Sequence, residues 1–257
     1  MTLSTVTPKL FQPKALLCAA VLLASVTLGP VSWAADDFSA AERALFMDNQ
    51  LGALKPPVTL QFSYRKSGTL EAAFDDTVAV TLRNPAQGPC CNASAEFLHG
   101  DRQLKLPDIE SAQGNPAVLY FLERDIREMQ RLTKGQPNYF RKRIRMAVAQ
   151  GATLRPVQVA WAGKPVDGQE ITLTPYLDDP LRARFEQLAA KQYVFTLSAA
   201  VPGGVHSIRT QVAGAMPGSP PVLVEEMALL GAVPAAALTV KTAGKVAAAV
   251  AKSRQQP

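Results

Sequence analysis

The chain has 257 residues, of which 47% are hydrophobic and 19% are charged, and its formal net charge is +6. This composition excludes an intrinsically disordered chain, and a single long apolar run excludes a membrane protein with several spans. Three cysteines and two histidines are too few for a disulfide-dense scaffold, a four-thiolate zinc site or a site of three imidazoles.

The N-terminus has the three parts of a secretory signal peptide. Two lysines precede an uncharged apolar stretch over 15–29, and Ser32 and Ala34 are the small residues required before a cut that follows Ala34. We therefore predict that residues 1–34 are removed and that the protein acts in an oxidising compartment, the bacterial periplasm. An uncleaved membrane anchor is the alternative, which the helix-breaking Pro30 disfavours.

The first part of the remaining chain predicts a short helix followed by strands. Ser39 and Glu42 form a capping box, so the helix should start near residue 40. Hydrophobic and polar residues then alternate with a period of two, which is typical of half-buried antiparallel strands. The expected strands lie at 58–65, 77–83, 93–98 and 103–106.

The period then changes to that of a helix. Asn115 and Pro116 predict a helix start, and apolar residues share one helical face until Gly135. A second helix is expected over 138–150, so we interpret 115–150 as a helical hairpin inserted into the sheet.

Strands return after this hairpin. We expect a third helix from Asp179 to about Lys191, with strands before and after it. Residues 233–257 are rich in alanine and carry four basic and no acidic side chains, so we interpret them as a tail outside the fold, disordered or partly helical. The strands of this part are expected at 157–161, 171–173, 193–197, 205–212 and 222–230.

Blocks of strands joined by short turns predict an α+β fold. We expect one antiparallel β-sheet, flat or curved, with helices packed on one face of a single domain over 35–232. This order of elements resembles that of periplasmic lipoprotein carriers, in which a curved antiparallel sheet wraps inserted helices around a hydrophobic groove. The resemblance implies a groove of this kind.

Familiar catalytic and phosphate-binding motifs are missing from the sequence. It contains no G-x-S-x-G, H-E-x-x-H or G-x-x-x-x-G-K-[ST] pattern, and we expect no metal and no cofactor. His99 and His206 lie beside predicted turns and are interpreted as ordinary polar residues of loops or strand ends. A periplasmic hydrolase stays open as an alternative, with Asp125, His99 or His206 as the candidate reactive group.

Cys90 and Cys91 are the two thiols that remain after removal of the signal peptide. They lie in a predicted turn between strands, where they would bond to each other, pair between chains, or stay as thiols that bind a soft metal such as Cu(I). We interpret them as a redox pair in an exposed loop, with no assigned role.

Asp125 falls within the apolar arc of the first hairpin helix on a helical wheel. A carboxylate on the core face must be paired or protonated. The structural interpretation is an ion pair with an arginine of the second helix or a capping contact. The functional interpretation is a general acid or base, or a group that anchors a ligand.

The hairpin is strongly basic, because residues 123–145 contain eight basic and three acidic side chains. In an exported protein this charge favours anionic lipid, another anionic envelope component or an acidic protein as partner, and disfavours nucleic acid. The alternative is a solvated helix face with internal pairs, such as Glu123 with Arg127 and Glu128 with Arg131. The candidate binding residues are Arg127, Arg131, Lys134, Arg141, Lys142, Arg143 and Arg145.

These features together predict a non-enzymatic, exported binding or carrier protein. Its ligand would be an anionic or amphipathic molecule of the cell envelope, with peripheral contact to a membrane. The alternative is an envelope assembly factor that docks a partner protein through the hairpin or the tail.

Overall fold

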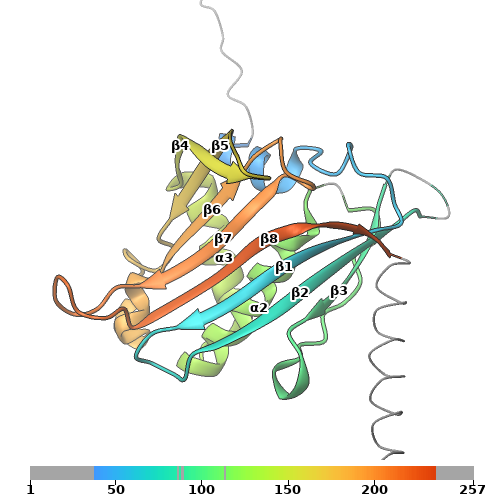
Figure 1. Cartoon of the computed structure of the whole chain (residues 1–257). Helices are drawn as coiled ribbons and strands as arrows, with labels where there is room; N and C mark the ends of the chain where they lie inside the picture. The colour runs from blue at the N-terminus through green and yellow to red at the C-terminus, as the bar shows by residue number, and fades with distance from the viewer. Residues whose placement is uncertain (1–37, 86, 88–89, 113, 236–257) are drawn as a thin grey trace, which may run out of the picture. The chain divides into compact units, whose positions relative to one another are not determined.

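The computed structural model describes residues 38–235, apart from 86, 88–89 and 113. These residues form one antiparallel sheet with helices packed against one of its faces (Figure 1), so the predicted α+β fold is confirmed. The predicted signal peptide over 1–34 and the tail beyond residue 235 lie outside the described residues.

The sheet is open and has eight strands in the order β3-β2-β1-β8-β7-β6-β5-β4. Neighbouring strands are antiparallel throughout, and β1 lies beside β8, the last strand along the chain. The strands are β1 (Val58–Ser67), β2 (Phe74–Arg83), β3 (Asn92–Phe97), β4 (Thr153–Trp161), β5 (Lys164–Leu173), β6 (Gln192–Leu197), β7 (Val205–Val212) and β8 (Leu223–Pro234).

The helical hairpin connects the two edges of the sheet. β3 and β4 follow one another in sequence but lie at opposite edges, so the chain between them has to cross a face of the sheet. α2 (Pro116–Thr133) and α3 (Pro137–Gln150) make this crossing (Figure 1). As predicted, α2 begins at Asn115, whose side chain accepts a hydrogen bond from the N–H of Ala117.

A short N-terminal helix precedes the sheet. α1 (Ala40–Glu42) has the expected capping box between Ser39 and Glu42, and it continues into a π-helical turn, η1 (Arg43–Met47). Ser39 also donates a hydrogen bond of 3.2 Å to the carbonyl of Val148, which ties this segment to the end of α3.

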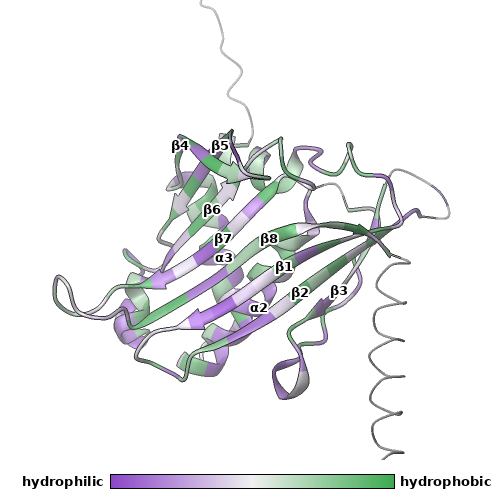
Figure 2. Cartoon of the chain, in the orientation of Figure 1, coloured by the Kyte–Doolittle hydropathy of each residue, from purple (hydrophilic) through white to green (hydrophobic). Residues whose placement is uncertain are grey.

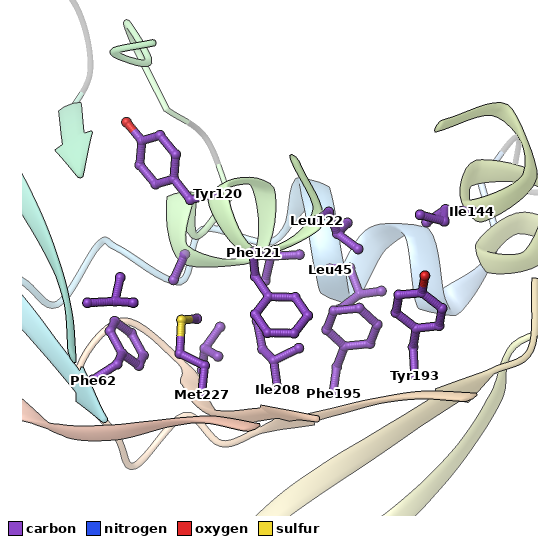
Figure 3. Close-up of a cluster of buried hydrophobic side chains, with 14 of the residues drawn as sticks. Leu45, Phe62, Tyr120, Phe121, Leu122, Ile144, Tyr193, Phe195, Ile208 and Met227 are labelled. Carbon is purple, nitrogen blue, oxygen red and sulfur yellow. The ribbon is translucent and has the colours of Figure 1, made fainter. Parts of the chain in front are cut away.

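The core lies between the sheet and the helices. Phe62, Met227, Ile208 and Phe195 rise from four neighbouring strands toward α2, where Phe121 meets them (Figure 3). These five side chains are fully buried, and burying one of this size contributes about 1.5–3 kcal/mol. The alternation of hydropathy along the strands (Figure 2) thus corresponds to the two faces of the sheet.

The expected strand at 103–106 does not form. Within it only Leu104 pairs, in an isolated bridge with Phe97, directly after a 3₁₀ turn, η2 (Gly100–Arg102). Pro107 follows this segment and has no N–H to donate, so the pairing is interrupted there and resumes only as a second isolated bridge, between Ile109 and Ala93.

The expected third helix, from Asp179 to about Lys191, is also wrong. The segment forms two 3₁₀ turns, η3 (Arg182–Arg184) and η4 (Glu186–Ala190). Glu186, the first residue of η4, has a φ of 51°, which an α-helix does not allow.

The last strand is longer than predicted. Val233 and Pro234, expected to begin the tail, pair with Thr59 and Val58 at the end of β1. The sheet therefore continues to Pro234.

Candidate functional site

An apolar groove lies beside the helical hairpin. Its volume is about 690 Å³, within the ~300–1,000 Å³ that is typical of ligand pockets. Its described walls come from the segment 38–47, the loop around 106–109, α2 and α3, and not from the strands. The lining residues are Phe38, Glu42, Phe46, Met47, Leu106, Pro107, Ile109, Leu119, Tyr120, Leu122, Glu123, Ile126, Arg141, Ile144 and Arg145.

Several large apolar side chains of the groove contact solvent. Phe38 is 48% exposed, Met47 is 44% exposed and Leu119 is 42% exposed. Below them, Leu122 of α2 and Ile144 of α3 are buried on the helix side of the core (Figure 3). Large apolar side chains that share an exposed concave surface mark a binding site more often than isolated ones do.

Most charges at the groove are engaged. Glu42 accepts a hydrogen bond of 2.8 Å from the N–H of Ser39 within the capping box. Arg141 makes a forked contact with Glu123, with nitrogen–oxygen distances of 2.8 and 3.1 Å. Arg145 is exposed, and within the described part of the chain it has no acidic partner.

The seven basic residues predicted to bind a ligand fall into two groups. The first group is held by acidic side chains, of which Glu123 and Glu128 belong to the hairpin and Glu71 and Asp179 lie outside it, so the alternative interpretation of pairs internal to the hairpin is supported only in part. The pairs are Arg127 with Glu123, Arg131 with Glu128 and Glu71, Arg141 with Glu123, and Arg143 with Asp179.

The second group is Lys134, Lys142 and Arg145. All three are exposed, and in the described residues none of them forms an ion pair. Of these, Arg145 is the one that lines the groove.

Asp125 is fully buried, as its place within the apolar arc predicted, but its partner is not an arginine. Lys191 donates a hydrogen bond to Oδ1 of Asp125, and the hydroxyl of Tyr193 donates one of 2.5 Å to Oδ2. Burial raises the pKa of Tyr193 well above its usual value, and the neighbouring Asp125 raises it further. Asp125 does not line the groove.

A buried ion network surrounds Asp125 between α2 and the sheet. Glu225 of β8 is fully buried and accepts hydrogen bonds from Arg124, from Tyr64 at 3.1 Å and from Lys191 at 3.5 Å. Burial alone raises the pKa of Glu225, but the charges of Arg124 and Lys191 outweigh it and lower the pKa to about 2. The network consists of Lys66, Arg124, Asp125, Glu128, Lys191 and Glu225.

The network is balanced, with three cationic and three anionic side chains, which supports a structural role. Sequence reasoning identified only Asp125. The period-two pattern could have identified two more members of the network. Lys66 lies two positions after the buried Tyr64 on β1, and Glu225 lies two positions before the buried Met227 on β8, so both point to the inner face of the sheet.

The two histidines lie outside the groove. His99 contacts Asp76 through Nδ1 at 2.7 Å, and Nε2 of His206 lies 3.3 Å from the carbonyl oxygen of Ala160. Among the described residues, no group of three or more His, Cys, Asp and Glu side chains is placed to hold a metal ion.

Cys90 and Cys91 are joined to each other by a disulfide, which is the first of the three states considered from the sequence. Cys90 is exposed and Cys91 is buried. Neither cysteine lines the groove.

In the part of the chain that the structure describes, no helix has the length and apolarity needed to cross a membrane.

Comparison with known proteins adds little to this picture. No protein-family model matches the chain. No curated protein matches it in sequence. Among solved structures it is similar to the lipoprotein LppX of Mycobacterium tuberculosis, at 11% sequence identity and a TM-score of 0.27, over 66% of this chain and 84% of that chain. A likeness this distant carries no argument about function, so the function has to be argued from the groove.

Proposed function

We propose that this protein is an exported, non-enzymatic binding or carrier protein, whose apolar groove takes the hydrocarbon part of an amphipathic ligand of the cell envelope. The observation that carries the proposal is the joint exposure of Phe38, Met47 and Leu119 in a groove of about 690 Å³. Covering apolar surface is favourable by about 25 cal/mol per Å², so a hydrocarbon chain laid along these side chains gains binding free energy from them.

The polar groups of the groove support binding over catalysis. Glu123, which would be a candidate acid or base, accepts hydrogen bonds from both Arg127 and Arg141. Glu42 is committed to the capping box with Ser39. A reactive acid and base need to be poised toward a bound substrate, and these carboxylates are bound to their own neighbours instead.

A neutral apolar probe tests the proposal. N-phenylnaphthylamine fluoresces when it leaves water, and we expect saturable binding to the purified protein. Leu119→Asp places a charge among the exposed apolar side chains of the groove and should weaken binding by about 10-fold or more, equivalent to ~1.4 kcal/mol.

The matched control is Leu230→Asp. Leu230 is 61% exposed on β8 and does not line the groove, so this variant should bind the probe like the wild type. Absence of saturable binding, or equal loss in both variants, would refute the proposal. Circular dichroism of both variants establishes that they are folded.

A further inference from the structure

The charges around the groove indicate the head group of its ligand. We propose that the groove selects amphiphiles whose hydrocarbon chain ends in a negatively charged oxyanion, a carboxylate or a phosphate, and that Arg145 binds this head group. The inference rests on the proposed function and narrows the seven basic candidates to one residue.

Four charged side chains line the groove, and they differ in whether a neighbouring group already contacts them. Glu42 is held by the N–H of Ser39, and Glu123 and Arg141 neutralise each other through two short contacts. Arg145 is the lining cation that forms no ion pair in the described part of the chain, whereas Glu42 keeps its negative charge and already accepts a hydrogen bond from Ser39. A ligand that brings an anion to this place completes the pair, and a neutral or cationic ligand does not.

The position of Arg145 on α3 suits a head group. It follows directly after Ile144, which is buried at the base of the groove, while Arg145 itself is exposed. Both residues line the groove, so a hydrocarbon chain packed there with its end at Arg145 would leave the head group in contact with water. The guanidinium fork fits two oxygens of a carboxylate or phosphate at once.

The two other cations of the hairpin that form no ion pair among the described residues lie elsewhere. Lys134 and Lys142 are exposed like Arg145, but neither lines the groove. They attract anions only through long-range electrostatic attraction, and salt in the buffer screens this attraction. Lys142 is three positions from Arg145 on the same helix, so it is a matched control for charge without contact.

The experiment compares ligands that share one chain and differ in head group. Dodecanoate, dodecyl phosphate, dodecanol and dodecyltrimethylammonium, each below its micelle concentration, displace the neutral probe from the wild type, from Arg145→Gln and from Lys142→Gln. The buffer pH keeps the carboxylate ionised. We expect the wild type to prefer the two anions over dodecanol by about 2- to 5-fold, which is the size of effect that an exposed ion pair gives.

The two variants show which residue causes the preference for anionic ligands. In Arg145→Gln the two anions should bind no better than dodecanol, with the anion and dodecanol affinities compared within the same variant. Lys142→Gln should retain the preference. A preference that survives in Arg145→Gln, or that falls equally in Lys142→Gln, overturns the inference.

The outcomes also separate this inference from the proposed function. If the neutral probe does not bind the wild type, the groove is not an apolar ligand site and both proposals fail. If the probe and dodecanol bind but the anions show no advantage, the groove stands as an apolar site and the assignment of the head group to Arg145 fails.

Discussion

Lys191 and Asp125 face each other in the protein interior with no exposed surface, although they are 66 positions apart in the sequence. Lys191 directly precedes β6 and Asp125 lies in the middle of α2, so this ion pair connects the start of the strand to the helix. A buried ion pair is weak evidence of net stabilisation, but it makes the loss of either partner severe, because the other charge is left uncompensated.

We therefore expect Asp125→Asn to lower the free energy of unfolding by about 3–5 kcal/mol. Urea denaturation at neutral pH measures this change. The double variant Asp125→Leu with Lys191→Met removes both charges, and its loss should be clearly smaller than the sum of the losses for Asp125→Leu and Lys191→Met alone. Additive losses would show that the two residues are not coupled.

Glu225 makes the stability sensitive to acid. Its pKa is lowered from 4.5 to about 2, so the folded state is stabilised in full above pH 4.5 and loses this contribution as the pH falls toward 2. The loss over this window should be on the order of 3 kcal/mol. Urea titrations at several pH values between these limits would show it as a falling free energy of unfolding.

A variant pair assigns this acid dependence to one carboxylate. Glu225→Gln should make the profile below pH 4.5 less steep, because glutamine does not titrate. Glu128 keeps its own share of the acid dependence, because burial raises its pKa but Arg131, Arg124 and Lys66 lower it by more. Glu226→Gln is the control, since the neighbouring Glu226 is 44% exposed and points to the opposite face of the sheet. If Glu225→Gln and the wild type show parallel profiles, Glu225 is not the responsible group.

Asn115 links the start of α2 to a turn between β6 and β7. Its Oδ1 accepts the N–H of Ala117 at 2.8 Å, and its Nδ2 donates to the carbonyl of Gly203, which has a φ of 73°. Asn115→Ala removes both contacts and should cost about 1–3 kcal/mol of unfolding free energy.

Asn115→Ser separates these two contacts. Serine keeps a capping oxygen but does not reach Gly203, so its thermal unfolding midpoint should lie between those of the wild type and Asn115→Ala. Equal midpoints for the two variants would mean that the cap itself contributes nothing.

Two arginines of α3 should differ sharply in their effect on stability. Arg143 pairs at 2.7 Å with the carboxylate of Asp179, which has no exposed side-chain surface, so Arg143→Ala should cost about 3 kcal/mol. Arg141 and its partner Glu123 are 41% and 26% exposed, so Arg141→Ala should cost less than about 1 kcal/mol. Urea denaturation of both variants decides this, and similar losses would contradict the difference in burial as its cause.

Local features of the sequence predicted most of the secondary structure. Period-two alternation located the strands, because neighbouring side chains of a strand point to opposite faces. The capping residues Ser39 and Asn115 marked helix starts, because their side chains satisfy free N–H groups in the first turn. The burial of Asp125 followed from helix geometry alone.

Other local predictions failed where distant residues intervene. Asp179 accepts a hydrogen bond of 2.7 Å from the N–H of Leu181, as a helix cap would. Its carboxylate is also bound by Tyr139 and Arg143 of α3. The chain after Asp179 forms 3₁₀ turns and not an α-helix. Leu104 has a strand-like sequence around it but pairs only with Phe97. Tyr139 and Arg143 lie about 40 positions before Asp179, outside any local sequence window.

The sequence by itself determined that this protein is an α+β sheet protein with a basic helical hairpin, because hydrophobic period and capping are properties of neighbouring residues. Only the tertiary structure decided which face of the hairpin forms a groove, since its walls come from separate segments of the chain. It also decided which charges stay available. Arg141 and Arg145 are equivalent in sequence, one helical turn apart, but packing places Glu123 of α2 against Arg141 and leaves Arg145 exposed. Ion pairs depend on distance in space, and folding sets that distance.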